Sequence, residues 1–491
     1  MDISSRELEL IVKQVVAGLQ GNTPQTVKAP GTSQVVYKRA EAECPAAVSG
    51  QYGVFERVDD AIEAAYKAQK EYAANYKIHD RQRIIEAIRR TAREHVEELC
   101  RMVVEETRMG RYEDKLEKHL AVINKTPGPE CLTTEAMSGD TGLMIEEYAP
   151  FGVIASITPT TNPTETIINN TISMIAGGNS VVFNVHPKAK NVSAYCLQLV
   201  NKAIVDAGGP ENLITMAKEP TMENVDKLAA SPHIRLMAGT GGMGMVNALL
   251  RSGKKTIGAG AGNPPVIVDE TADVELAARE IYKGASFDNN ILCFAEKEVF
   301  VVDEVADGFL YNMEKEGAYK LERNQIDQLL GIVFKRKNGG GYEVNKDWVG
   351  KDAHLMLEAM GIANHHNTRL IICEVPADHP FVTVEQLMPV LPIVRCRNFE
   401  QAVDMAVEAE HGNRHTASIF SKDVDHMTRF ARVIETTIYV KNSATLAGVG
   451  IGGEGHTTMT IAGPTGEGIT CAKSFTRRRR CMLAEGGLRI I

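Results

Sequence analysis

Residues 153–183 read VIASITPTTNPTETIINNTISMIAGGNSVVF, and this stretch decides the fold class. Two short apolar runs, 153–157 and 180–183, stand on either side of a helical segment near 164–176. Short runs rich in β-branched residues that alternate with helices are typical of a parallel sheet covered on both faces. The stretch therefore predicts an α/β fold.

The same alternation continues along the chain. Residues 58–107 are helical in pattern, and further helical segments lie near 190–207 and 242–252. The remaining runs of the first series are 234–237 and 266–268. A second series of apolar runs follows, at 299–302, 369–374, 390–394, 418–420 and 438–440. Because 491 residues exceed what one hydrophobic core serves, we predict two parallel-sheet α/β domains in series.

The composition is that of a globular protein, 44% hydrophobic and 24% charged. No run approaches the roughly 18 apolar residues of a membrane span, and the first residues lack a secretory pattern. Nine single cysteines without a Cys-x-x-Cys pair favour a reducing compartment and disfavour a metal site. A net charge of −9 disfavours nucleic acid. We expect a cytoplasmic protein with neither membrane nor nucleic-acid partners.

Residues 1–20 predict an amphipathic helix, and residues 21–49 a flexible linker rich in Gly, Pro, Ser and Thr. The apolar face of the helix consists of Leu8, Ile11, Val12, Val15 and Leu19. A helix separated in this way either docks into the groove of a partner or folds back onto its own core.

Three segments carry candidate chemistry. Residues 239–244, GTGGMG, follow an apolar run and precede a helical segment. They form either a phosphate-binding helix start or a plain strand-to-helix turn. Residues 286–293, SFDNNILC, deliver Cys293 from a polar turn at the start of the second domain. Cys293 is either a small core residue or a nucleophile, and a nucleophile needs a polar, partly exposed setting that lowers its pKa.

The third segment, ITPTTNP at 157–163, presents Asn162 between two prolines. The amide N–H of Asn162 suits the stabilisation of an oxyanion, an effect worth roughly 3–4 kcal/mol. Asn is equally suited to cap the following helix.

Together these segments resemble the aldehyde dehydrogenase superfamily, and most closely the CoA-acylating propionaldehyde and acetaldehyde dehydrogenases of bacterial microcompartments. The resemblance extends from about residue 50 to the end of the chain and includes the detached N-terminal helix. Its most specific stretches are SFDNNILC, GAGAGNPPVIVDETAD, EQLMPVLPIVR and GGEGHTTMTIAGPTGEGIT.

The resemblance implies a role for each matching residue. Cys293 is the nucleophile, and Asn162 forms the oxyanion hole with the Cys293 backbone N–H. Glu385 holds the nicotinamide ribose. The remaining residues implied to contact the cofactor are Thr158, Pro159, Thr160, Thr240, Gly241, Gly242, Ala259 and Gly260.

Two departures from the superfamily pattern are informative. Ala259 stands where hydrolytic members carry the glutamate that activates water, so water attack lacks its general base. A thiol needs less help, which favours transfer to CoA, although small residues here also permit tight packing. His186 stands near the position where many relatives have a lysine beside the adenine ribose. His186 is otherwise an ordinary loop histidine, so we expect NAD without excluding NADP.

The resemblance also implies a domain order. A cofactor and CoA domain spans 50–257, a catalytic domain spans 258–441, and residues 442–491 return to the first domain. A hairpin at about 131–149 and the C-terminal strand build a homodimer or homotetramer. Residues 1–20 recruit the chain to a shell or core enzyme in a microcompartment lumen. The four arginines at 477–480 fit a solvated or interface strand better than an anion site.

The implied reaction converts a short aliphatic aldehyde, NAD and CoA to acyl-CoA and NADH through a thioester on Cys293. Three alternatives remain: a hydrolytic aldehyde dehydrogenase, a reductase of acyl phosphates, and an inactive scaffold recruited by its N-terminal helix.

Overall fold

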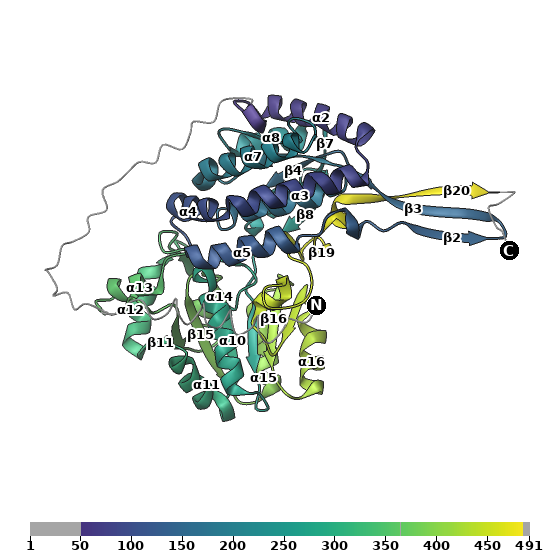
Figure 1. Ribbon diagram of the computed structural model, residues 1–491. Coiled ribbons are helices and arrows are strands. Elements are labelled where there is room, and N and C mark those ends of the chain that lie inside the picture. The colour runs from purple at the N-terminus through teal and green to yellow at the C-terminus, as the bar shows by residue number, and fades with distance from the viewer. Residues whose placement is uncertain (1–50, 364, 485–491) are drawn as a thin grey trace, which may run out of the picture. The chain divides into compact units, whose positions relative to one another are not determined.

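The computed structural model describes residues 51–363 and 365–484 (Figure 1). The predicted docking helix at 1–20 and the linker at 21–49 lie outside the described residues. Within the described residues, none of the helices combines the length and apolarity needed to cross a membrane.

A six-stranded parallel sheet organises the first half of the chain. Its strands, in spatial order, are β1 (Val54–Phe55), β6 (Ile214–Ala217), β5 (Ser180–Asn184), β4 (Val153–Ile157), β7 (Ile234–Thr240) and β8 (Lys255–Ala259). The helices of this half are α2 (Val58–Asn75), α3 (Ile78–Glu94), α4 (Val96–Thr107), α5 (Tyr112–Lys125), α6 (Pro163–Ala176), α7 (Lys190–Asp206), α8 (Met222–Ala230) and α9 (Met243–Leu250). The stretch at 153–183 is thus a strand, a helix and a parallel strand, as predicted.

Helices cover both faces of this sheet, which explains why its strands are apolar throughout. Ile154 of β4 packs in one core with residues of α3, α6 and α7. Its neighbours Val153 and Ala155 pack in another core with residues of α2. Alternate side chains of a strand point to opposite faces, so a strand buried on both faces is a continuous apolar run.

A seven-stranded parallel sheet organises the second half. Its strands, in spatial order, are β11 (Tyr319–Lys320), β14 (Ile371–Glu374), β15 (Val390–Cys396), β10 (Glu298–Val302), β9 (Pro265–Val268), β16 (Thr416–Phe420) and β17 (Ile438–Lys441). The helices are α10 (Val274–Ser286), α11 (Asp303–Lys315), α12 (Arg323–Val333), α13 (Ala353–Ala359), α14 (Pro380–Thr383), α15 (Phe399–Glu410) and α16 (Val424–Ile434). The prediction of two parallel α/β sheets is confirmed.

The apolar run at 266–268, which was grouped with the strands of the first sheet, belongs to the second sheet. The run at 266–268 is β9, and it pairs with β10 and β16 of the second sheet. A short apolar run carries no information about which strands it will pair with. The chain therefore passes from the first sheet to the second between β8 and β9.

A three-stranded antiparallel sheet joins segments far apart in the sequence. It consists of β2 (Glu135–Gly139), β3 (Gly142–Pro150) and β20 (Thr476–Ala484), with β3 and β20 side by side along their length (Figure 1). The arginines at 477–480 lie on β20, where Arg478 and Arg480 donate to Glu146 of β3 at 2.8 and 3.0 Å. These charges are paired within their own sheet, which agrees with a strand rather than an anion site.

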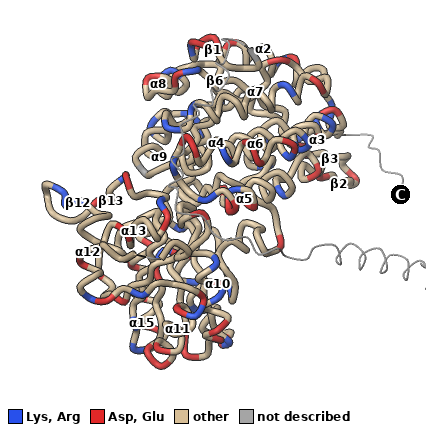
Figure 2. The backbone as a smooth tube through the Cα atoms, turned by 60° about the vertical axis from the view of Figure 1, so that its left-hand side comes forward, with Lys and Arg blue, Asp and Glu red and all other residues tan. Residues whose placement is uncertain are grey.

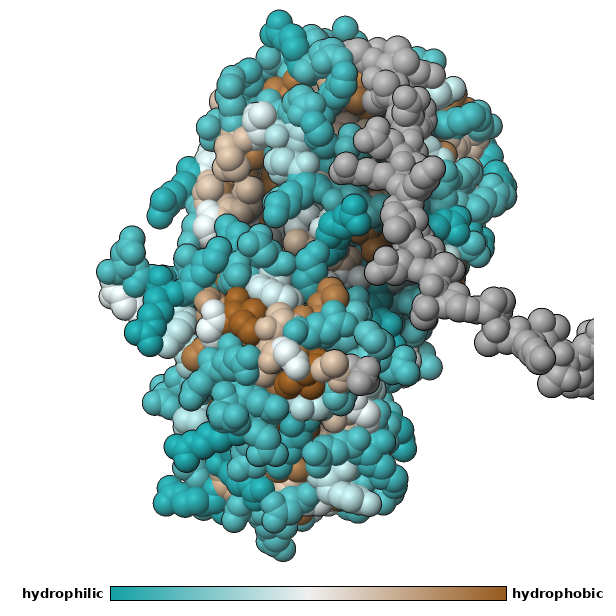
Figure 3. Space-filling view, turned by 90° about the vertical axis from the view of Figure 1, so that its left-hand side faces the viewer, coloured by the Kyte–Doolittle hydropathy of each residue, from teal (hydrophilic) through white to brown (hydrophobic). Residues whose placement is uncertain are grey.

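Charges of both signs are distributed over the described chain. Lys and Arg segments alternate with Asp and Glu segments along the backbone (Figure 2). The face shown in Figure 3 is mostly hydrophilic, with smaller areas of apolar residues. The largest exposed apolar side chains on the three-stranded sheet are Met137, Met482 and Leu483.

Candidate active site

A cavity of about 390 Å³ collects most of the residues singled out in the sequence. Its walls come from the ends of β4 and β7 and the segments that follow them, from the segment between β8 and β9, from Cys293, and from residues near 385 and 458–461. The predicted site residues that line it are Thr158, Pro159, Thr160, Asn162, Thr240, Gly241, Gly242, Gly260, Cys293 and Glu385. Segments separated by more than 200 residues thus meet around one space.

Ala259 is the predicted site residue that does not line this cavity. It is buried at the end of β8, and its carbonyl oxygen accepts a hydrogen bond from the Gly241 backbone N–H at 3.1 Å. Its neighbours Gly260 and Ala261 line the cavity instead. Strand β8 ends at Ala259, so the backbone turns toward the cavity only after it.

Cys293 follows a sharp turn formed by η4 (Phe287–Asn290). Asp288, Asn289 and Asn290 all have left-handed backbone conformations, with φ values of 48°, 54° and 58°. Asp and Asn tolerate this conformation better than other residues with a side chain. Their side chains also anchor the turn, since Asn290 Nδ2 donates to the carbonyl oxygens of Ala285 and Glu296 at 2.8 and 2.9 Å. The polar run before Cys293 is therefore a rigid support.

The pKa of the Cys293 thiol is raised, whereas a nucleophile was expected to have a lowered one. Burial, and then the nearby Glu385 carboxylate, raise the pKa of Cys293 to about 12, and the Lys297 ammonium only partly offsets them. The walls are largely apolar here, and an apolar environment disfavours a thiolate. A raised pKa keeps the resting thiol mostly protonated near pH 7, and a positive charge beside it would favour the thiolate.

Lys297 also stabilises this turn through hydrogen bonds. Its Nζ donates to the carbonyl oxygens of Asn290 and Leu292 at 2.7 and 2.9 Å, and also to Asn290 Oδ1. Burial lowers the pKa of Lys297 to about 8. The role of this lysine could not be predicted from the sequence, because a single Lys between two glutamates is typical of an exposed strand end.

Asn162 occupies the N-cap position of α6, but its side chain makes no cap hydrogen bond. Its Oδ1 accepts a hydrogen bond of 2.6 Å from Lys118 Nζ, and its Nδ2 donates weakly to Thr161 Oγ1 at 3.3 Å. An ammonium only donates, so the amide oxygen must face Lys118 and the amide nitrogen the other side. The capping alternative is wrong, and Asn162 presents an oriented N–H group at the cavity wall.

The cavity offers polar groups that suit a dinucleotide. The hydroxyls of Thr158 and Thr160 are buried and have no hydrogen-bond partner among the described residues. Gly242 is the N-cap of α9 and has no side chain that could accept from the first N–H groups of the helix. These N–H groups have no acceptor within the helix and are open to a ligand. Such groups bind phosphate. Glu385 Oε1 accepts only a long hydrogen bond, 3.4 Å from the Gly262 N–H, and can receive ribose hydroxyls.

His186 also lines the cavity. Its Nδ1 accepts a hydrogen bond from the Lys188 backbone N–H at 3.2 Å. Burial, together with the positive charges of Lys188 and Lys346, lowers the pKa of His186, so the imidazole is neutral near pH 7. His186 thus presents an uncharged ring to the cavity.

Comparisons with known proteins agree with this geometry. A model described as the aldehyde dehydrogenase family matches residues 29–463. The chain is 47% identical over 469 residues to the acetylating acetaldehyde dehydrogenase EutE of Salmonella typhimurium, covering 95% of this chain and 98% of that protein. It is 49% identical, with a TM-score of 0.87, to the Rhodopseudomonas palustris propionaldehyde dehydrogenase with bound CoA and an acylated cysteine, covering 90% of this chain and 100% of that one. It is also 49% identical, with a TM-score of 0.85, to a propionaldehyde dehydrogenase from the Clostridium phytofermentans fucose utilisation bacterial microcompartment, covering 88% and 98%.

Proposed function

The chain belongs to the aldehyde dehydrogenase family, and on that premise we propose that it converts short aliphatic aldehydes to acyl-CoA with NAD and CoA. The observation that carries the proposal is the meeting of Cys293 and Asn162 at one cavity that also holds unpartnered polar groups suited to a dinucleotide. The names of similar proteins, acetylating acetaldehyde dehydrogenase and CoA-binding propionaldehyde dehydrogenase, support the same chemistry.

Cys293 forms the covalent bond to substrate. Its sulfur, once deprotonated, attacks the aldehyde carbonyl carbon, and the carbonyl oxygen becomes an oxyanion in a hemithioacetal. The Nδ2 of Asn162 and the backbone N–H of Cys293 donate to that oxyanion. A donor held in place before the reaction contributes more than water does, because no reorganisation is needed.

The cavity then holds the hemithioacetal against the cofactor. Glu385 would hold the ribose next to the nicotinamide, and the helix start at Gly242 would hold the diphosphate. When bound, the nicotinamide supplies a hydride acceptor, and loss of hydride leaves an acyl thioester on Cys293. The positive charge of the oxidised ring also favours the Cys293 thiolate over the thiol.

The acidic residues around the cavity favour transfer of the acyl group to CoA over its hydrolysis. The stretch 258–262 has no acidic side chain, and Glu385 is the only carboxylate among the described residues that line the cavity. With Glu385 assigned to the ribose, water lacks a dedicated general base near the thioester. The thiol of CoA is partly ionised near pH 7 and attacks the acyl carbon without such help. The bond between the acyl carbon and the Cys293 sulfur breaks, Cys293 leaves as a thiolate, and the acyl carbon becomes bonded to the CoA sulfur.

We further propose NAD rather than NADP. The described residues that line the cavity include neither Lys nor Arg, and His186 is neutral. A 2′-phosphate would thus lack a cationic partner in these walls.

We propose two assembly properties on the strength of the resemblance. The three-stranded sheet of β2, β3 and β20, with its exposed Met137, Met482 and Leu483, pairs subunits into a dimer or tetramer. Residues 1–20 recruit the enzyme to a microcompartment, the setting of one of the similar structures. Deleting residues 1–20 should then leave activity intact and abolish co-purification with shells. Loss of activity through unfolding would contradict the second property.

The deciding experiment measures steady-state rates with C2 to C4 aldehydes, with NAD or NADP, and with or without CoA. We expect sustained NADH formation only when CoA is present, and none in Cys293→Ala. Sustained carboxylate release without CoA would instead identify a hydrolytic enzyme. Turnover of acyl phosphate in place of acyl-CoA would identify a reductase of acyl phosphates. If wild type and Cys293→Ala are equally inactive, the chain is an inactive scaffold.

A further inference from the structure

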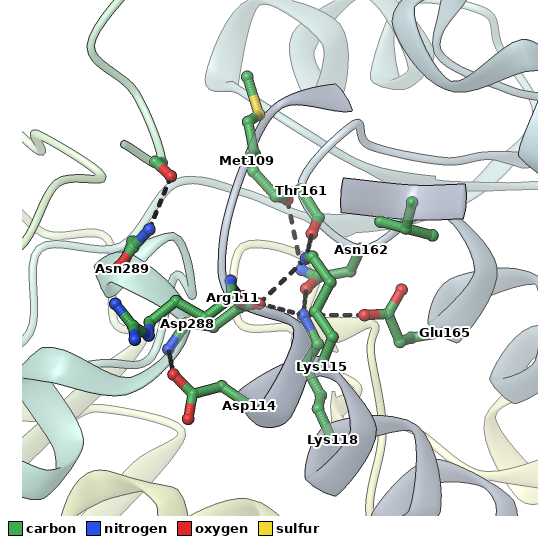
Figure 4. Close-up of polar contacts among 12 residues, drawn as sticks. Met109, Arg111, Asp114, Lys115, Lys118, Thr161, Asn162, Glu165, Asp288 and Asn289 are labelled. Carbon is green, nitrogen blue, oxygen red and sulfur yellow. Dashed lines mark hydrogen bonds and ion pairs between the residues drawn. The ribbon is translucent and has the colours of Figure 1, made fainter. Parts of the chain in front are cut away.

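The side chain of Lys118 lies at the centre of a buried polar cluster beside the cavity (Figure 4). Its Nζ is 2.6 Å from Asn162 Oδ1, 2.6 Å from Asp288 Oδ2 and 2.9 Å from Glu165 Oε1. The contacts with Asn162 and Asp288 are hydrogen bonds and the contact with Glu165 is an ion pair, so three oxygen atoms surround the ammonium.

The cluster is closed to solvent. The side chains of Lys118, Asp288 and Glu165 are 0% exposed. Burial alone would lower the pKa of Lys118, but the Asp288 and Glu165 carboxylates outweigh it and hold the pKa above its ordinary value. Lys118 is therefore a permanent cation, fixed in position by its partners.

Two of the three acceptors belong to the proposed catalytic apparatus. Asn162 carries the proposed oxyanion donor, and its amide orientation depends on the contact with Lys118, because no other residue of the described chain donates to its Oδ1. Asp288 lies in the left-handed turn that leads to Cys293. The ammonium thus ties the oxyanion donor and the support of the nucleophile to the same point on α5.

We infer that Lys118 is a positioning residue for the acylation step, which it serves by holding the Asn162 amide with its nitrogen toward the oxyanion and in register with the Cys293 turn. The inference rests on the proposed function of Asn162. Without the ammonium, the amide can rotate and present its oxygen to the oxyanion, which repels it.

Lys115 provides a matched control one helical turn earlier on α5. Its side chain is equally buried, and its Nζ contacts the same Asp288 Oδ2 at 3.2 Å and the Thr161 carbonyl oxygen at 3.5 Å. Among the described residues, Lys115 forms no hydrogen bond with Asn162. Removing either lysine takes one cation from the cluster, but only Lys118→Met releases the amide.

The test is a double-mutant cycle on the full-length enzyme, read as the single-turnover rate of NADH formation. Asn162→Ala should lower that rate by about 10²–10³-fold. Lys118→Met should lower it by about a hundredfold, and the double variant should be within about threefold of Asn162→Ala alone, because coupled residues are not additive. Lys115→Met should lose less than about fivefold. The KM for CoA should stay within about twofold in all variants, because none of these residues is proposed to bind CoA.

The outcomes separate two failures. If Asn162→Ala leaves the acylation rate unchanged, the proposed oxyanion role fails. If Asn162→Ala is slow but the losses of Lys118→Met and Asn162→Ala multiply in the double variant, only the positioning role is overturned.

Where Lys118→Met does not fold, Lys118→Gln replaces it, because this neutral side chain keeps a donor for Asn162. The expected loss is then about tenfold, with the same non-additivity. If neither folds while Lys115→Met does, Lys118 belongs to the fold and the inference is wrong.

Discussion

The backbone of Gly262 lies against the carbonyl group of Cys293, with no room between them for a side chain. A Cβ on Gly262 would overlap the carbonyl oxygen of Cys293 and would also lie 3.0 Å from the Cγ of His415. The N–H of Gly262 meanwhile donates to Glu385 Oε1. This glycine thus sets the spacing between the proposed nucleophile and the proposed ribose ligand.

Gly262→Ala should lower kcat by about a hundredfold, because displacement of a reacting group by about 1 Å has effects of that size. The measurement is the steady-state rate with saturating aldehyde, NAD and CoA. The control is Gly331→Ala in α12, where an added Cβ meets nothing within 4 Å. If both alanine variants retain wild-type kcat, the contact does not position Cys293.

The pH dependence of Cys293 alkylation should follow its raised pKa. Since that pKa is about 12, the thiolate fraction, and with it the rate of labelling by iodoacetamide, should rise about tenfold per unit between about pH 7 and 10. Saturating NAD should accelerate labelling at about pH 7 by roughly tenfold or more, because a positive charge beside the thiol favours the thiolate. Cys293→Ala gives the background from other cysteines. A rate that levels off below about pH 8 without NAD would show that the resting thiol is already ionised.

Asp288→Asn should destabilise the fold strongly. Asp288 Oδ2 accepts from Lys115 at 3.2 Å and from Lys118 at 2.6 Å in the absence of solvent, and Asn keeps the left-handed backbone while removing the charge. Breaking a buried ion pair on one side costs about 3–5 kcal/mol, measured as the free energy of unfolding in urea. Asp352→Asn, which breaks a partly exposed pair with Arg111, should cost about 1 kcal/mol or less. Equal effects of the two variants would contradict the importance of the buried cluster.

Glu298→Gln should change how stability depends on pH. Both carboxyl oxygens of Glu298 are buried without a partner in the described chain, and burial raises its pKa well above the ordinary value. The folded state thus holds a proton that the unfolded chain releases above about pH 4.3. The contribution of Glu298 to the free energy of unfolding is complete below that pH and is lost as the pH rises toward the folded pKa.

Glu298→Gln removes this loss, so its stability relative to wild type should increase from about pH 4.5 to 8. Urea denaturation across that range measures the difference, with exposed Glu275→Gln as the control. A difference from wild type that stays constant with pH would mean that Glu298 is ionised in the folded protein.

Much of the fold followed from local sequence. The β-branched runs at 153–157 and 180–183 are buried strands on either side of α6. The helix α5 was not predicted, because its inner positions 115, 118 and 119 are Lys, Lys and His rather than apolar residues. Lys115 and Lys118 form ion pairs with Asp288 and Glu165, which lie far along the chain. No local pattern contains that information.

The candidate site was predictable to a similar extent. The family resemblance is confirmed, and residues from distant segments do line one cavity with Cys293. The raised pKa of Cys293 was not predictable, because it arises from packing around the thiol and from Glu385, 92 residues later in the chain. The position of Ala259 behind the cavity wall depends on where β8 ends, which is the least predictable feature of a strand.

The most direct test of the central claim is mass spectrometry of the enzyme after incubation with propionaldehyde and NAD in the absence of CoA. We predict a single acyl group, located on the peptide that contains Cys293 and released as acyl-CoA when CoA is added. An acyl group on any other residue, or acyl-CoA formation by an enzyme that never becomes acylated, would contradict the account.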